Sequence, residues 1–336
     1  MREHDSLYSW TRLLIALLLA TVGNIGMWVV VIVLPDIQQE FKIDRGTASI
    51  PFALTMVGFA IGNWVMGHVV DRYGITKTII LAATVNTAGY IAAMYVNNVY
   101  SLSILQFFIG LGTAAAFGPL IADTSHWFLK RRGIAVALIA SGNYFSGAIW
   151  PPLFNNTLQS DGWRDVYWIL ALSTVFIMIP LSFLLAKKIS EETARISDAA
   201  SSDKRQNVSI SPKALTILLS IAGIGCCVAM SMPQVHIVAF CIDLGFGPAV
   251  GAEMLSLMLI GGIISRLING LIADKLGGVY TLLIGSTLQC IALFLYLPFD
   301  GLVSLYIVSL VFGLSQGGIV PSYAIIIREY LPGADA

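Results

Sequence analysis

Ten long apolar runs follow one another along the chain, and they limit its fold more than any other feature. A helix needs about 20 apolar residues to cross roughly 30 Å of hydrocarbon. Backbone in lipid must satisfy its own hydrogen bonds, and these runs are too long and too uniformly apolar for the strands of a barrel. With 57% hydrophobic and 11% charged residues, the sequence predicts an all-α polytopic membrane protein. The runs lie near Leu13–Leu34, Ile50–Val70, Ile79–Val96, Leu102–Ile121, Ile134–Phe154, Val166–Leu185, Leu215–Phe240, Met254–Ile272, Leu282–Leu297 and Leu302–Tyr323.

One stretch of the chain occurs twice. Residues 58–74 read GFAIGNWVMGHVVDRYG, and residues 261–277, at a constant offset of 203, read GGIISRLINGLIADKLG. An internal repeat of this kind predicts two similar halves. The matching positions at the end of each copy are Gly67 and Gly270, Asp71 and Asp274, Arg72 and Lys275, and Gly74 and Gly277.

The repeat also suggests how the chain divides. Residues 187–213 form the one long polar stretch and read as a cytoplasmic linker between an N-terminal half, 1–186, and a C-terminal half, 214–336. The offset of 203 carries Gly133, where the fifth run begins, to Ala336. We therefore expect six helices in the first half and four in the second, ten of twelve, in a chain that is a fragment or a shortened product.

The distribution of charge predicts the orientation in the membrane. Of the 19 Lys and Arg residues, Lys42, Arg45 and Arg164 fall on one side, Arg266 lies within a span, and all others fall on the side of the N-terminus. Because cytoplasmic loops carry the excess of basic residues, we predict a cytoplasmic N-terminus. The four cysteines have no metal-ligand spacing, so we expect no metal and no cofactor. Without paired carboxylates or a nucleophile constellation in the spans, an enzyme is disfavoured, and nothing indicates a nucleic-acid partner.

Arg266 is the candidate binding residue. It is the single basic residue placed in the middle of a span, and its counterpart in the first copy is Asn63. A guanidinium stays charged and can hold a carboxylate through paired hydrogen bonds, so Arg266 is predicted to face a watery cavity and bind an anion. The competing interpretation is an arginine tied to carbonyl groups or to an acid in a helix contact.

Other polar residues within the spans are candidates for the wall of a cavity. Asn24 and Trp28 lie four residues apart on one helical face, which allows either a pore-lining pair or an asparagine bonded to a neighbouring helix. His236 could contact a ligand or be a packed, hydrogen-bonded residue, and the two interpretations are equally supported. The remaining candidates are Asn143, Tyr144 and Gln316.

Three further expectations concern helix ends. Asp71 is well placed to meet the positive end of a neighbouring helix or an arginine on an adjacent loop. Asp123 and His126 are interpreted as interfacial residues or partners of nearby basic residues rather than proton carriers. Pro151 and Pro152 are expected to break the end of the fifth span.

The repeated loop resembles the signature loop of the major facilitator superfamily. The first copy carries Gly67, Asp71, Arg72 and Gly74 at the signature spacing, and the second is a partial echo. Within that superfamily, three patches resemble bacterial members of the monocarboxylate transporter group. They are Trp127–Arg132 followed by Ala135 and Ala137, Pro233–His236 followed by Asp243 and Gly245, and Arg266–Ala273.

The resemblance implies a bundle of two pseudo-symmetric halves that alternate access to a central site. It also implies that Arg266, at the matching position of the eighth helix, receives the substrate carboxylate. Two positions depart from the better-studied relatives, which have an aspartate where this chain has Gly262 and a lysine where it has Asp36. Because both residues are linked in the family to proton coupling, the coupling ion is left open.

Our leading hypothesis is therefore a monomeric secondary transporter of a small organic anion, a monocarboxylate, in a bacterial-type inner membrane. Its partners would be the lipid bilayer, the carboxylate and a proton. Two alternatives are an efflux transporter for drugs or metabolites and a solute sensor that signals through the Lys187–Lys213 linker without transport.

Overall fold

The computed structural model describes residues 4–190, 210–298 and 300–331. The described chain is helical and contains no strand, as the apolar runs predict. Most of the predicted linker, residues 191–209, lies outside the described residues.

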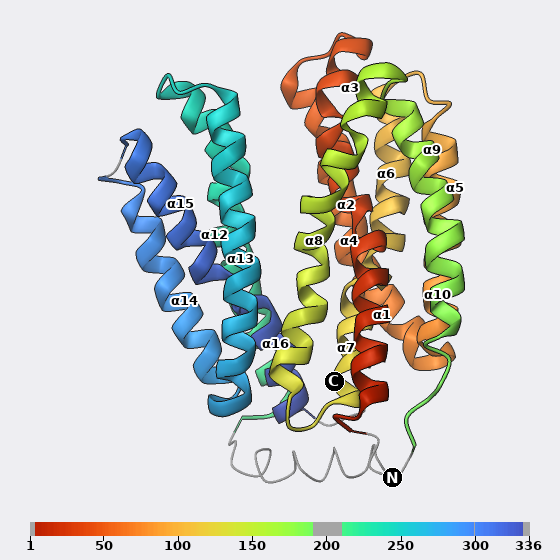
Figure 1. The fold of residues 1–336 in the computed structure, drawn as a ribbon, viewed down its shortest axis with the longest axis vertical. Coiled ribbons are helices and arrows are strands. Elements are labelled where there is room, and N and C mark those ends of the chain that lie inside the picture. The colour runs from red at the N-terminus through yellow and green to blue at the C-terminus, as the bar shows by residue number, and fades with distance from the viewer. Residues whose placement is uncertain (1–3, 191–209, 299, 332–336) are drawn as a thin grey trace. The chain divides into compact units, whose positions relative to one another are not determined.

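The helices of the first part of the chain follow the order of the apolar runs (Figure 1). They are α1 (Leu7–Gly23), α2 (Ile25–Ile32), α3 (Leu34–Phe41), α4 (Arg45–Tyr73), α5 (Ile75–Ala93), α6 (Val99–Thr113), the 3-10 turn η1 (Ala114–Ala116), α7 (Gly118–Trp127), α8 (Arg132–Ser160), α9 (Trp163–Ser173), the π-helical turn η2 (Thr174–Met178) and α10 (Ile179–Phe183).

Residues 210–298 and 300–331 form five more helices (Figure 1). They are α12 (Pro212–Asp243), α13 (Pro248–Leu276), α14 (Gly278–Leu295), α15 (Leu302–Gln316) and α16 (Ile319–Tyr330).

In the described residues, nine helical stretches are long and apolar enough to cross a membrane, where the sequence predicts ten. The third expected run, Ile79–Val96, is not among these nine stretches, although the structure places it in the helix α5. α5 is a continuous helix, but its mean hydropathy is lowered by Lys77, by several threonine residues and by Asn86. Its buried face includes Asn86, so its polar residues are accommodated by neighbouring helices rather than by lipid.

The helices group into two compact units. One unit contains Leu7–Thr124 and Phe145–Lys188. The other contains Met1–Ser6, Ser125–Tyr144 and Ile189–Ala336, so the first part of α8 belongs with the helices of the second half. α8 continues through Pro151 and Pro152 to Ser160, and the expected break there is wrong. Prolines are tolerated in membrane helices because neighbouring groups satisfy the freed backbone.

The repeat predicted from the sequence is present in the structure. α4 and α13 both have 29 residues, and both of their ends differ by the offset of 203. α6 and α15 have 15 residues each and begin and end at the same offset. Both copies end α4 or α13 at a glycine with positive φ, 82° at Gly74 and 84° at Gly277.

Glycines hold the two central helices of each copy close together. A Cβ atom added at Gly58 of α4 would overlap the carbonyl group of Phe107 in α6. The equivalent Gly261 of α13 faces the carbonyl oxygen of Leu310 in α15, at 3.2 Å from the added Cβ. Small residues that let helix backbones approach are the usual means of packing helices in lipid.

The first span is interrupted at Asn24, between α1 and α2. Asn24 is fully buried, and its Nδ2 donates to the carbonyl oxygens of Ala20 at 2.8 Å and Ala116 at 3.0 Å. Ala116 ends η1, the turn that interrupts the fourth span. Of the two interpretations of Asn24, the structure therefore shows the asparagine bonded to a neighbouring helix.

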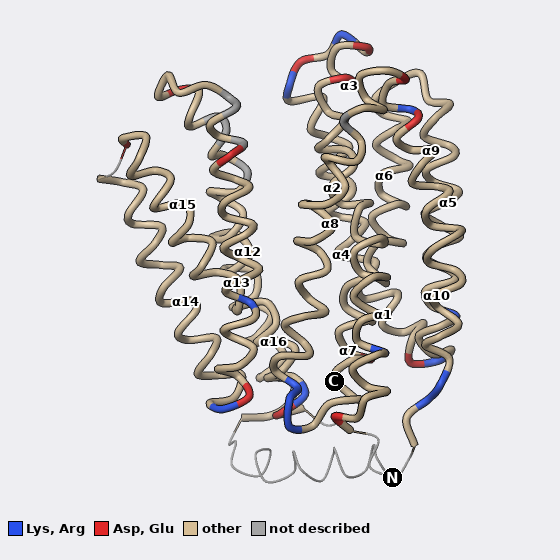
Figure 2. The backbone as a smooth tube through the Cα atoms, in the orientation of Figure 1, with Lys and Arg blue, Asp and Glu red and all other residues tan. Residues whose placement is uncertain are grey.

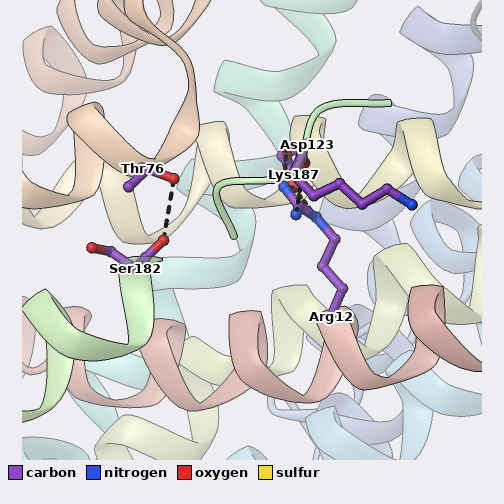
Figure 3. Close-up of polar contacts among 5 residues, drawn as sticks. All are labelled: Arg12, Thr76, Asp123, Ser182 and Lys187. Atoms are coloured by element: carbon purple, nitrogen blue, oxygen red, sulfur yellow. Dashed lines mark hydrogen bonds and ion pairs between the residues drawn. The ribbon is translucent and has the colours of Figure 1, made fainter. Parts of the chain in front are cut away.

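An ion pair joins α1 to α7 within the same unit (Figure 3). Arg12 is buried, and its Nη2 lies 2.9 Å from Oδ2 of Asp123. Arg12 Nη1 also donates to the carbonyl oxygen of Lys187 at 3.1 Å. Asp123 is thus paired, as expected, although its partner is Arg12 rather than the neighbouring basic cluster. Figure 3 also shows the Thr76 hydroxyl donating to the Ser182 carbonyl at 3.1 Å.

Charged residues gather at the ends of the helices, while the middles are mostly uncharged (Figure 2). At one such end, Glu40 of α3 accepts two hydrogen bonds of 2.7 Å from the guanidinium of Arg164 in α9. Glu40 also accepts a bond of 2.6 Å from Nε1 of Trp163. These bonds, first of all those from Arg164, hold the pKa of Glu40 below its ordinary value.

We predict that Gly58→Ala lowers the midpoint of thermal unfolding, because its new Cβ meets the Phe107 carbonyl. Overpacking of this kind costs about 1–3 kcal/mol. Gly67→Ala, on the same helix, has no atom within 4 Å of the added Cβ and is the matched control. It should be neutral or stabilising by up to about 1 kcal/mol, since alanine favours a helix over glycine. Equal effects of the two variants in detergent-solubilised protein would contradict the close packing of α4 on α6.

We predict that the Glu40–Arg164 contact stabilises the protein at neutral pH and is lost in acid. The folded-state pKa of Glu40 is lowered, so its contribution is present above the unfolded-state pKa and disappears as the pH falls through the folded-state value. Glu40→Gln should lower the unfolding midpoint at pH 7 by an amount equivalent to about 1 kcal/mol at most, because the pair is partly exposed. The difference between Glu40→Gln and the wild type should shrink and then vanish as the pH falls through the lowered folded-state pKa of Glu40. A difference that is independent of pH would contradict this assignment.

Candidate functional site

The candidate site is built around Arg266, near the middle of α13. Its side chain is 2% exposed and is among the largest fully buried side chains of the described residues. The equivalent position of the first copy is Asn63 in α4. In the described contacts, Asn63 donates to the carbonyl oxygen of Phe59 in its own helix. Insertion scales put the cost of a charge at the centre of a membrane helix at about 2.5–3.5 kcal/mol, so its surroundings must offset a large desolvation penalty.

The groups that contact the Arg266 guanidinium are neutral. Nε donates to the carbonyl oxygen of Gly317 at 3.2 Å, and Nη1 donates to the carbonyl oxygen of Ala140 in α8. The guanidinium carbon lies 3.6 Å from the centre of the Tyr144 ring, also in α8. The two ion pairs recorded in residues 4–190, 210–298 and 300–331 involve other arginines. The cation is therefore solvated by carbonyl dipoles and an aromatic face.

Gly262 makes room for the aromatic face. It lies one turn before Arg266 on α13, and a Cβ atom added there would come within 2.6 Å of Cε2 of Tyr144. Any side chain at this position would push the ring away from the guanidinium. The position at which the resemblance expects an aspartate is thus filled by the Tyr144 ring.

α12 supplies another side of the same site. The Tyr144 hydroxyl lies 4.0 Å from the sulfur of Met230. One turn later, Gln234 Nε2 donates to Oε1 of Gln316 at 3.1 Å. Gln316 is fully buried and directly precedes Gly317, which bonds Arg266. Side chains four residues apart lie on the same face of a helix, so Met230 and Gln234 both face this group.

The structure brings together three of the six predicted binding residues, Arg266, Tyr144 and Gln316. Asn143 lies next to Tyr144 in α8 and is half-buried. His236 lies in α12 and is exposed. Trp28 belongs to the other unit, where its ring packs near Gly147, at 3.1 Å from a Cβ added there.

The signature residues of the second copy form a helix contact. Gly270 of α13 packs directly on the start of α8, because an added Cβ would lie 2.9 Å from the carbonyl oxygen of Gly133. Asp274 accepts hydrogen bonds from the backbone N–H groups of Gly133 at 2.5 Å and Ile134 at 3.1 Å. A carboxylate at this end of α8 satisfies free N–H groups and the positive end of the helix dipole.

The signature residues of the first copy lie at a surface. Asp71 and Arg72 are exposed at the end of α4, and the Arg72 guanidinium lies 5.4 Å from the Tyr73 ring centre. The contact with the positive end of a helix that we expected for Asp71 is thus seen for Asp274, which corresponds to it in the repeat. Lys275 is exposed in the last turn of α13.

Sequence reasoning missed several residues. Asp5 accepts hydrogen bonds from the backbone N–H groups of residues 129, 130 and 131, at 3.2, 3.0 and 3.0 Å, just before α8. Arg328 was also missed: its Nη2 lies 3.0 Å from Nδ1 of His126, which the sequence analysis interprets as interfacial or as a partner of nearby basic residues. Gln234 and Met230 escaped notice because nothing in the sequence shows which face of α12 is turned inward. Gln234 could have been found as one of three glutamines in the apolar runs of this half, with Gln289 and Gln316.

Comparison with known proteins decides the family. The family model for the Major Facilitator Superfamily matches residues 16–336. The chain belongs to the Major Facilitator Superfamily. Together with the nine apolar helices of the described residues, membership indicates an integral membrane protein. The relatives described next are named as transporters or as an efflux protein.

The relatives include several kinds of transporter. The chain is 22% identical to MFS-type transporter 1 of Ophiocordyceps sp. (strain BCC 1869) and 24% identical to an agnestins efflux protein of Paecilomyces divaricatus. Each match covers 84% of this chain, and the chain spans 63% and 64% of the length of these two relatives. Monocarboxylate transporter 13 of Rattus norvegicus is 24% identical over 94% of this chain and 72% of its own length.

The fold is that of solved members of the same superfamily. A double-tryptophan mutant of XylE matches with a TM-score of 0.76 and 14% identity, over 98% of this chain and 83% of that chain. The proton:xylose symporter XylE bound to a bromodeoxyglucose matches with a TM-score of 0.69 and 15% identity, over 98% and 84%. These matches confirm the fold class predicted from the sequence.

We predict that Asp274→Ala destabilises the start of α8, because the N–H groups of Gly133 and Ile134 lose their acceptor. The loss should be about 1–2 kcal/mol, and Asp274→Asn, which keeps an acceptor oxygen but no charge, should lose less. Amide hydrogen exchange at residues 133 and 134 should be faster in Asp274→Ala than in the wild type. Unchanged protection of these two amides would rule out the capping role.

Proposed function

We propose that this protein is a secondary transporter that carries a small organic anion, a monocarboxylate, by alternating access. Arg266 is its carboxylate anchor. Tyr144 and Gln316 line the site, together with Asn143 and His236 from the sequence analysis. The N-terminus lies in the cytoplasm of a bacterial-type cell, the transporter acts as a monomer in the inner membrane, and a proton accompanies the anion.

The observation that carries this proposal is the buried charge of Arg266. Its recorded contacts are two carbonyl oxygens and the face of Tyr144, so they solvate the cation without neutralising it. Removing a charge from water without neutralising it is costly, and a bound carboxylate would neutralise it through charge-assisted hydrogen bonds. An anion is therefore the ligand class that this site favours.

The geometry also suggests how the site would recognise a small anion. Tyr144 covers one face of the guanidinium, and carbonyl oxygens accept hydrogen bonds from Nε and Nη1. Nη2 makes none of the recorded hydrogen bonds of the described residues, so it is the group that would meet a carboxylate. Because Gly262 has no side chain, the Tyr144 ring occupies the space that an acidic side chain would otherwise fill. The relative named monocarboxylate transporter 13 supports this substrate class, since it matches over 94% of this chain.

An efflux transporter is the second candidate. The observation in its favour is the agnestins efflux protein, whose identity to this chain, 24%, equals that of the monocarboxylate transporter. The two functions differ in substrate and direction. An exporter of large metabolites would not depend on a guanidinium that binds carboxylate, so variants of Arg266 separate the two.

We predict that Arg266→Gln abolishes most uptake of labelled pyruvate or lactate by proteoliposomes that contain the full chain. Losing a buried, charge-assisted contact with the anion costs about 2–5 kcal/mol, which is a thirtyfold loss or more. Arg266→Lys should also be impaired, because an ammonium group cannot reproduce the paired hydrogen bonds of a guanidinium.

The matched control is Asn63→Ala, at the equivalent position of the first copy, where the side chain bonds only its own helix in the described contacts. It should leave uptake close to that of the wild type. Thermal unfolding of each variant shows whether it folds, and added pyruvate should raise the unfolding midpoint of the wild type but not of Arg266→Gln. Normal transport by Arg266→Gln would refute the anchor role.

A further inference from the structure

Two glutamine side chains lie against each other beside the arginine. Gln234 of α12 donates through Nε2 to Oε1 of Gln316, the last residue of α15, at 3.1 Å. Gln316 is fully buried, and its own Nε2 has no hydrogen-bond partner in the described part of the chain. A buried polar group without a partner is rare and costs about 1–3 kcal/mol, so this amide requires an occupant that accepts its hydrogen bond.

The amide pair and the guanidinium belong to one group of side chains. Gly317 follows Gln316 directly, and its carbonyl oxygen accepts the Nε hydrogen bond of Arg266 at 3.2 Å. On α12, Met230 lies one turn before Gln234 and contacts Tyr144, whose ring covers the guanidinium. The unpartnered amide N–H of Gln316 therefore lies in the same cluster as the Arg266 guanidinium. It is at the end of α15, and the next residue, Gly317, accepts a hydrogen bond from Arg266.

We propose that Gln316, oriented by Gln234, is a specificity-determining residue of this site. Its Nε2 donates a hydrogen bond to an oxygen of the bound anion other than the carboxylate oxygens that Arg266 holds. This proposal rests on the proposed function, because it needs an anion on Arg266. The site then selects organic anions that carry a second acceptor oxygen over anions whose remainder is hydrocarbon.

The physical basis of this selection is the buried amide itself. An anion with a second acceptor oxygen satisfies the amide N–H of Gln316, while an anion without one leaves that group desolvated and unpaired. Sites built to hydrogen-bond a substrate oxygen reject analogues that lack it far more strongly than apolar pockets reject a methylene group. Gln234 orients the amide of Gln316, because its Nε2 donates to Oε1 and so leaves Nε2 of Gln316 to donate to the anion.

The test compares uptake of labelled pyruvate and propionate by proteoliposomes that contain the full chain. The two anions share a carboxylate and three carbons, and they differ by one carbonyl oxygen. The wild type should prefer pyruvate by about tenfold or more in kcat/KM. Gln316→Leu should remove most of this preference by raising KM for pyruvate while leaving propionate unchanged. Gln316→Met, which keeps the side-chain length, should do the same, and Gln234→Leu should weaken the preference.

The matched control is Gln289→Leu. Gln289 is also buried with an unpartnered Nε2, but it lies on α14 and makes none of the recorded contacts with the Arg266 cluster. It should leave the ratio of the two anions unchanged. If Gln316→Leu lowers uptake of both anions by the same factor, its role is structural and the proposal is overturned.

The test separates this proposal from the function on which it rests. Arg266→Gln should impair uptake of both anions equally. If the wild type takes up neither anion, or if Arg266→Gln transports both normally, the proposed function fails and this proposal fails with it. If uptake depends on Arg266 but Gln316→Leu keeps the preference for pyruvate, this proposal alone is wrong.

Discussion

The close approach of two helix backbones determines the arrangement of each unit. In the first unit a glycine of α4 lies against a carbonyl group of α6, and in the second Gly313 of α15 lies against the carbonyl group of Met258 in α13. Lipid offers no hydrophobic gain for such packing, so contact must come from small residues and close van der Waals fit. The other helices then surround these pairs, and the rigid core they form can carry a charge that isolated helices could not.

The charge is accommodated by replacing water with fixed neutral groups. Arg266 bonds the Ala140 and Gly317 carbonyl groups, which belong to helices held in place by independent contacts. One of these is the packing of Gly270 on Gly133, one turn along α13, which brings the start of α8 against that helix. Because α8 is held there, Tyr144 can lie over the guanidinium. The signature residues of the second copy and the Arg266 cluster are thus parts of one helix contact.

The sequence predicted the elements that depend on composition and register. The helical class, the repeat and the burial of a cation at 266 follow from apolar length and a constant offset. The sequence left open whether this cation faces a watery cavity or is tied to carbonyl groups, and the structure shows hydrogen bonds to two carbonyl oxygens. Which carbonyl groups these are could not be predicted, because their position depends on helix rotation. The continuation of α8 through Pro151 and Pro152 was missed for a related reason, since the tolerance of a proline is decided by neighbouring helices. The contact with a helix start that was expected for Asp71 is made by its repeat counterpart, Asp274. In the described residues only Asp274 of the two faces the start of a helix.

The repeat shows how one copy gained a polar site that the other lacks. The copies differ at many equivalent positions, and three of these differences concern residues of the Arg266 cluster. In the first copy Phe59 packs its ring on Phe117, with ring centres 5.8 Å apart, which fills the position with hydrocarbon. In the second copy Gly262 leaves that position open to the Tyr144 ring. The guanidinium of Arg266 replaces the amide of Asn63, and the longer amide of Gln316 replaces the hydroxyl of Thr113. Each change alone would bury an unsatisfied group or leave a gap, so the three residues of the second copy depend on one another. The pairs are Phe59 with Gly262, Asn63 with Arg266, and Thr113 with Gln316.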